Sequence, residues 1–99
     1  MFWPQRKREV GAIAKMLMEA FEKRLQIEIE YLSQAARAGE SPHKIRRVDI
    51  YHVREPYFEG YCHLRNDVRQ FRIDRVLDVK PTWQRYSIPA NFVPIAAPE

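Results

Sequence analysis

The fold is decided by the stretch Tyr57-Phe-Glu-Gly-Tyr-Cys-His-Leu-Arg-Asn-Asp-Val-Arg-Gln-Phe-Arg-Ile-Asp-Arg-Val76. Two runs in which apolar and polar residues alternate stand on either side of Asn66-Asp67. Asn and Asp tolerate the positive φ angles of a tight two-residue turn. The pattern therefore predicts a β-hairpin whose turn is closed by Arg65 and Val68.

A two-residue turn also fixes the expected register, because side chains alternate between the two faces of a strand. Cys62 is then expected opposite Phe71 on an apolar face. Tyr61 is expected opposite Arg72 on the outward face, within reach of a cation–π contact. The same register sets Glu59 against Asp74, a like-charge pair that either a bulge near Gly60 or a neighbouring cation would relieve.

The hairpin is preceded by one amphipathic segment. Apolar residues recur there at three- and four-residue spacing, which predicts a helix over residues 9–25 with a single apolar stripe. The stripe comprises Val10, Ile13, Ala14, Leu17, Ala20, Phe21 and Leu25. We expect this helix to cover one end of a barrel.

The remaining segments alternate with period two and read as strands. Residues 26–32 place Ile27, Ile29 and Tyr31 on one face, residues 44–55 form a second strand after a polar loop, and residues 76–80 form a last strand ended by Pro81. With the hairpin, this gives five strands. The aromatic residues of the Pro-rich tail, residues 81–99, are expected to pack on the barrel: Trp83, Tyr86 and Phe92.

The central stretch resembles the signature of WYL domains, most specifically in its ending Phe71-Arg-Ile-Asp-Arg-Val76. The tripeptide that names the family falls on Pro56-Tyr57-Phe58, so only its central tyrosine is kept. The resemblance implies a mainly β protein with an N-terminal α-helix, built as a small five-stranded Sm-like (SH3-type) barrel. Residues 1–99 would form a single domain, with residues 1–8 as a basic, aromatic lead-in and residues 26–80 holding the strands.

Charge and composition narrow the functional classes. The net charge is +4, and the composition is that of a globular protein without a membrane span or signal peptide. Arginine dominates the basic residues between positions 46 and 75, which favours carboxylate or phosphate recognition. A solvated face with internal ion pairs explains the same arginines equally well. Cys62 is the only cysteine, which fits a reducing cytoplasm.

An enzymatic constellation is not found in the sequence. His43, His52 and His63 are scattered, and no third ligand is placed to complete a metal site with the two strand histidines. Neither a phosphate-binding glycine loop nor an activated serine is evident. We therefore expect a non-enzymatic protein with no catalytic residues, no metal and no cofactor.

The interleaved aromatic and arginine residues of the hairpin suit a ligand that stacks its bases and offers phosphates. By resemblance, WYL domains are ligand-sensing modules of bacterial transcription regulators. Their signature implicates one of Arg46 and Arg47, of which Arg47 is preferred, and several hairpin residues. The expected binding residues are Arg47, Tyr57, Tyr61, His63, Arg65, Arg69, Arg72 and Arg75.

The expected partner is single-stranded DNA or RNA, or a nucleotide-like effector. The alternative is a module for protein–protein interaction or oligomerisation, since Sm-like barrels pair through edge strands. Phe2 and Trp3 would then act as a docking element. WYL regulators usually carry a helix-turn-helix domain before the barrel, whereas one helix precedes it here; the chain is either a free sensor, an accessory module or part of a larger regulator.

Overall fold

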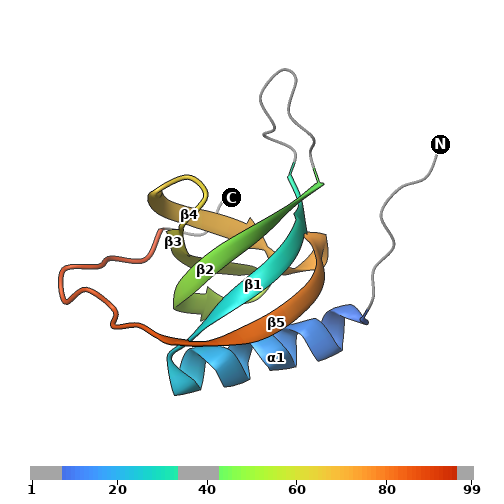
Figure 1. The fold of residues 1–99 in the computed structure, drawn as a ribbon, viewed down its shortest axis with the longest axis horizontal. Coiled ribbons are helices and arrows are strands. Elements are labelled where there is room, and N and C mark those ends of the chain that lie inside the picture. The colour runs from blue at the N-terminus through green and yellow to red at the C-terminus, as the bar shows by residue number, and fades with distance from the viewer. Residues whose placement is uncertain (1–7, 34–42, 96–99) are drawn as a thin grey trace.

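The computed structural model describes residues 8–33 and 43–95. One helix is followed by five strands, which confirms the predicted mainly β fold with an N-terminal helix (Figure 1). The elements are α1 (Val10–Lys23), β1 (Leu25–Leu32), β2 (His43–Arg54), β3 (Tyr57–Cys62), β4 (Asp67–Arg72), the short 3-10 helix η1 (Ile73–Arg75) and β5 (Val76–Arg85). The aromatic lead-in at Phe2 and Trp3 lies outside the described residues.

Helix α1 buries the centre of the predicted apolar stripe, but it ends earlier than expected, and Leu25 is the first residue of β1. Ile13, Leu17 and Ala20 are almost fully buried, and the helix runs beneath β1 and β5 in Figure 1. It ends at Arg24, which takes the left-handed conformation (φ 55°) and donates its backbone N–H to the carbonyls of Ala20 and Phe21. None of the described helices is long and apolar enough to cross a membrane.

The five strands form one antiparallel sheet in the order β4-β3-β2-β1-β5. This order and the strong curl of the sheet in Figure 1 fit an Sm-like barrel. Strands β4 and β5 lie at the two ends of the order. Each therefore presents one edge that pairs with no other described strand.

Strand β5 is longer than the sequence indicated. The prediction that Pro81 ends it is wrong, because the strand continues to Arg85 and pairs Pro81 with Ile27 and Arg85 with Leu25. Proline has no N–H to donate, so it is tolerated in an edge strand, where one side of the backbone needs no partner. The irregularity between Leu25 and Ile27 in this pairing accommodates the change of register.

The central hairpin forms, but with a different turn. Cys62 pairs with Asp67, so the connecting loop spans four residues rather than two, and Asn66 alone has a positive φ, of 56°. The loop is closed by the Asn66 N–H, which donates to the Cys62 carbonyl at 2.8 Å. Paired residue numbers sum to 129 instead of the expected 133. Because the shift of four is even, the paired side chains of residues 57–62 and 67–72 keep their expected faces, whereas Ile73–Arg75 leave the strand as η1.

The new register changes which residues meet. Phe71 lies opposite Phe58 rather than Cys62, and Arg72 lies opposite Tyr57 rather than Tyr61. Glu59 faces Gln70, so the expected clash between Glu59 and Asp74 does not arise.

A bulge does occur beside Gly60, in the neighbouring strand. Gly60 pairs with Ile50 and Glu59 pairs with His52, which leaves one extra residue in β2. The two backbones approach so closely that a Cβ on Gly60 would stand 2.2 Å from the Asp49 carbonyl oxygen. Glycine is required here for space.

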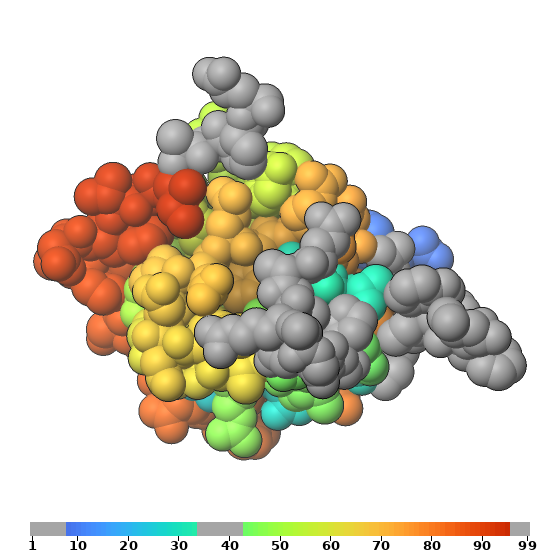
Figure 2. Space-filling view, turned by 90° about the horizontal axis from the view of Figure 1, so that it is seen from above, coloured from blue at the N-terminus to red at the C-terminus, as the bar shows by residue number. Residues whose placement is uncertain are grey.

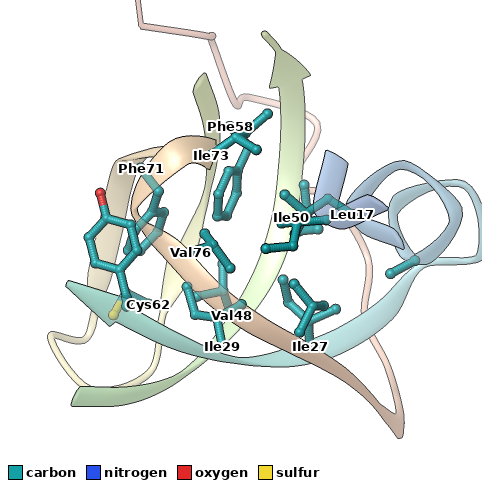
Figure 3. Packing of buried hydrophobic residues seen from close by; sticks show 14 residues of the cluster. Leu17, Ile27, Ile29, Val48, Ile50, Phe58, Cys62, Phe71, Ile73 and Val76 are labelled. Carbon is teal, nitrogen blue, oxygen red and sulfur yellow. The ribbon is translucent and has the colours of Figure 1, made fainter. Parts of the chain in front are cut away.

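The core lies between the curled sheet and α1. Phe58 and Phe71 stack with ring centroids 5.1 Å apart, and Tyr31 meets Phe71 edge-on at 5.1 Å. Figure 3 shows Leu17 of α1 reaching toward Ile50 on the other side of the same core. Cys62 is fully buried in this cluster, in the packing role expected from its place in the hairpin.

The C-terminal tail only partly follows expectation. Trp83 is 98% exposed, so the prediction that it packs on the barrel is wrong; it projects from the edge strand β5. Tyr86 does pack against the core and donates its hydroxyl hydrogen to the Ile50 carbonyl. Phe92 meets Tyr51 edge-on at 5.2 Å, which fastens the tail to β2.

Candidate functional site

Four of the predicted binding residues line one cavity of about 240 Å³, here called the basic cavity. It lies where the end of β1 and the start of β2 meet β4 and η1. Its lining comprises Tyr31, Ser33, Arg46, Tyr57, Arg69, Gln70, Phe71, Arg72 and Arg75. Four of these nine residues are arginines and none of them is acidic, so the cavity suits an anionic ligand.

Arg72 is held in place by two neighbours. Its Nε and Nη2 donate to the two carboxylate oxygens of Asp74 at 2.9 and 3.0 Å, and its Nη1 donates to the Tyr57 hydroxyl at 3.2 Å. The Asp74 carboxylate raises the pKa of the Arg72 guanidinium through this hydrogen-bonded pair. Arg72 therefore acts as a charged, oriented wall of the cavity.

Arg46 is the buried arginine of the cavity. It is 6% exposed, and its guanidinium carbon lies 5.6 Å from the centroid of the Tyr31 ring. Its Nε is buried and has no hydrogen-bond partner among the described residues. A buried charged donor without a partner is costly, so it signals a group that a ligand would satisfy.

The neighbouring Arg47 points the other way. Its side chain is 65% exposed, and its Nε lies 3.9 Å from the carboxylate of Glu28 on the outer face of the sheet. Alternation along β2 explains the difference, because Arg46 shares the inward face with Val48 and Ile50. The structure thus places Arg46, and not the preferred Arg47, in the basic cavity.

The other lining residues complete a basic and aromatic wall. Arg75 Nη1 donates to the Leu32 carbonyl at 3.4 Å, which ties η1 to the end of β1. Tyr31 accepts the backbone N–H of Arg72 at 3.0 Å, and burial raises the pKa of its hydroxyl. Arg69 is exposed at the rim.

Three further predicted residues lie away from this cavity. Tyr61 meets the ring of His63 edge-on at 4.9 Å, and His63 Nε2 lies 3.1 Å from Asp49 Oδ2. His63 and Arg47 line a separate hollow together with Trp83. Arg65 lies in the hairpin loop between β3 and β4. The structure therefore brings four of the eight predicted binding residues together in the basic cavity and leaves the other four outside it.

Sequence reasoning missed Tyr31 and Gln70 as cavity residues and did not prefer Arg46. The sequence does contain evidence for Arg46. Side chains alternate along a strand, so an arginine two residues before Val48 and four before Ile50 points to the same inward face. Tyr31 was assigned to the core, and it does pack there; only its hydroxyl edge reaches the cavity.

The histidines do not gather. His52 lies opposite Glu59 in the sheet, whereas His63 lies beyond the end of β3 beside Asp49. No group of three or more His, Cys, Asp or Glu residues within residues 8–33 and 43–95 is arranged to hold a metal ion.

Comparison with known proteins gives two findings. The family model for the WYL domain matches residues 12–81. The fold is also similar to proteasome accessory factor B/C (PafBC) of Arthrobacter aurescens, with a TM-score of 0.63 and 29% sequence identity. That similarity covers 85% of this chain and 13% of the PafBC chain, so this chain spans a small part of that protein. No curated protein matched the sequence.

Proposed function

Because this chain belongs to the WYL domain family, we propose that it is a non-enzymatic sensing module that binds single-stranded nucleic acid or a nucleotide-like effector in the basic cavity. Family membership and the similarity to PafBC support a regulator-associated module that binds a ligand or nucleic acid in general.

The observation that carries the proposal is the state of Arg46. A buried guanidinium whose Nε has no described partner lines a cavity with three further arginines. Desolvation makes the unpartnered Nε of a buried guanidinium unfavourable. A phosphate group would satisfy this donor.

Tyr57 supplies the aromatic part of the site. Its ring lies beneath the Arg72 guanidinium, whose carbon is 5.4 Å from the ring centroid, and it lines the basic cavity. A base stacked on this ring would leave its phosphate within the reach of the arginines. The site therefore matches both chemical parts of a nucleotide.

The test is a fluorescence titration with short DNA strands, short RNA strands and cyclic dinucleotides at low salt. Binding should weaken as salt rises, with a slope of about one log unit for each phosphate neutralised. Arg46→Ala should weaken it, whereas Arg47→Ala, which alters the outer face, is the matched control and should change it far less. Absence of binding at micromolar protein, or equal effects of the two variants, would contradict the proposal.

A second candidate function is pairing with a protein or with a second copy of the chain. One edge of β5 pairs with no other described strand, and Trp83 on that strand is 98% exposed; both observations favour it. Light scattering separates the two candidates. A stable oligomer without ligand that becomes monomeric in Trp83→Ala supports pairing through β5, and a monomer that binds oligonucleotides supports the sensing module alone.

A further inference from the structure

Glu59 is a buried carboxylate at the wall of a second cavity. It is 2% exposed, lies on β3, and accepts the backbone N–H of Ile95 at 2.7 Å through Oε2. The cavity has a volume of about 330 Å³ and is called here the Glu59 cavity. Its lining comprises Arg54, Glu55, Pro56, Tyr57, Phe58, Glu59, Gln70 and Ile95.

The Glu59 cavity adjoins the basic cavity. Tyr57 and Gln70 line both of them, so these two residues form the partition between the two spaces. On one side of the partition lie four arginines, and on the other lies a buried carboxylate. A ligand that spans Tyr57 would therefore need an anionic part next to a part rich in N–H donors.

Guanine is the base that meets the second requirement. A carboxylate has two acceptor oxygens side by side, and the Watson–Crick edge of guanine offers two adjacent donors, N1–H and the N2 amino group. Adenine, cytosine and thymine each offer a single donor position on that edge, beside an acceptor that would repel the carboxylate. Single-stranded ligands expose this edge for reading.

We propose that the Glu59 cavity is a base-reading subsite that selects guanine, with Glu59 as the specificity-determining residue and Tyr57 as the stacking surface. The inference rests on the proposed function, because it assumes that the phosphates bind in the basic cavity. It adds which base the module prefers and where that base lies.

The C-terminal tail contacts the Glu59 carboxylate at the edge of the subsite. The red C-terminal segment lies beside the yellow-to-gold hairpin in Figure 2, and the Ile95 N–H takes the acceptor that guanine would use. The tail is held farther back by Phe92 on Tyr51 and by a turn in which the Phe92 N–H donates to the Pro89 carbonyl at 3.0 Å. The Ile95 N–H thus fills one lone-pair site of the Glu59 carboxylate, and the tail competes with guanine for Oε2.

The test uses the full chain and four labelled trinucleotides that differ only in the central base, with thymine on both sides. Wild type should bind the guanine trinucleotide about tenfold more tightly than the others. Glu59→Gln should reduce this preference to within about twofold, since one acceptor is replaced by a donor. Ile95→Pro removes the competing N–H without touching Glu59, and should tighten guanine binding relative to wild type.

The outcomes separate the two proposals. If none of the trinucleotides binds to wild type or to Ile95→Pro, both the proposed function and this inference fail. If all four bind equally in both proteins, the basic cavity stands as the nucleotide site and guanine selection is overturned. A guanine preference that survives in folded Glu59→Gln overturns it as well. Because Ile95→Pro leaves the buried carboxylate in place, the inference remains testable even if Glu59→Gln does not fold.

Discussion

Arg72 lies over the ring of Tyr57, with its guanidinium carbon 5.4 Å from the ring centroid and its Nη1 donating to the tyrosine hydroxyl at 3.2 Å. The two residues face each other across β3 and β4 because the hairpin loop has four residues. This pairing brings the Tyr57 ring to the basic cavity and leaves Tyr61 opposite Val68.

The pairing assigns different roles to two tyrosines of the same strand. Tyr57→Ala should weaken oligonucleotide binding by about 1–3 kcal/mol, the usual contribution of one stacked base. Tyr61→Ala should leave binding nearly unchanged, because Tyr61 contacts His63 outside the basic cavity. Fluorescence titration of the two variants measures both effects, and a larger loss in Tyr61→Ala would place the ligand beside His63 instead of in the basic cavity.

Arg46→Met should separate binding from stability. Methionine keeps much of the length of the side chain and removes a buried charge whose Nε lacks a described partner. The free energy of unfolding should therefore stay the same or rise, while ligand affinity should fall by at least about tenfold. Urea unfolding and ligand titration provide the two readouts. A clear loss of stability would show that Arg46 serves the fold instead.

Phe71→Ala should destabilise the fold by about 3–5 kcal/mol, since it opens a large cavity in the core. Phe71 is 2% exposed and packs between Phe58 and Tyr31. Phe71→Leu, which keeps most of the apolar volume, is the milder control. Urea unfolding at neutral pH measures both variants, and equal losses would argue against a cavity as the cause.

Gly60 and Gly11 form a matched pair for the effect of one added methyl group. Gly60→Ala places a Cβ against the Asp49 backbone and should cost about 1–3 kcal/mol or more. Gly11→Ala lies in α1 with no heavy atom within 4 Å of the new Cβ, and should stabilise by up to about 1 kcal/mol. Thermal unfolding should show shifts of opposite sign.

Stability should also fall at alkaline pH through Tyr86. Burial raises the pKa of Tyr86 to about 12, above the value of 10.0 for an exposed tyrosine. The folded state thus holds its proton more tightly than the unfolded state, so this contribution is complete below pH 10 and is lost between pH 10 and 12. Burial raises the pKa of Tyr31 in the same direction.

Tyr86→Phe isolates that contribution. The variant should lose about 0.5–1.5 kcal/mol at pH 8, because the Ile50 carbonyl loses its hydroxyl donor. Its stability should then decline less steeply than that of wild type above pH 10. Urea unfolding over a pH series gives both values, and parallel curves for the two proteins would assign the alkaline loss to other groups.

Local pattern determined much of this protein. The alternation in residues 57–76 determined that a hairpin forms and which side chains face the core, and the spacing of Ile13, Leu17 and Ala20 determined the buried stripe of α1. Both follow from the fixed repeat of side-chain directions along strands and helices, which is visible within a few consecutive residues. The burial of Cys62 followed from the same alternation of side chains along the strand.

Only the tertiary structure decided the register, the extent of β5 and the composition of the cavities. Asn66-Asp67 fits a two-residue turn, yet the observed register, in which Phe71 stacks on Phe58, is shifted by four residues. An even shift keeps the faces of the paired residues, so the alternation of side chains does not reveal it. Pro81 stays within β5 because that strand lies at the edge of the sheet. Arg46, Tyr57 and Arg75 come from separate elements, and they line one cavity only because the sheet curls. The local sequence pattern does not predict such contacts, because contacts between residues far apart in the sequence depend on how the whole sheet closes.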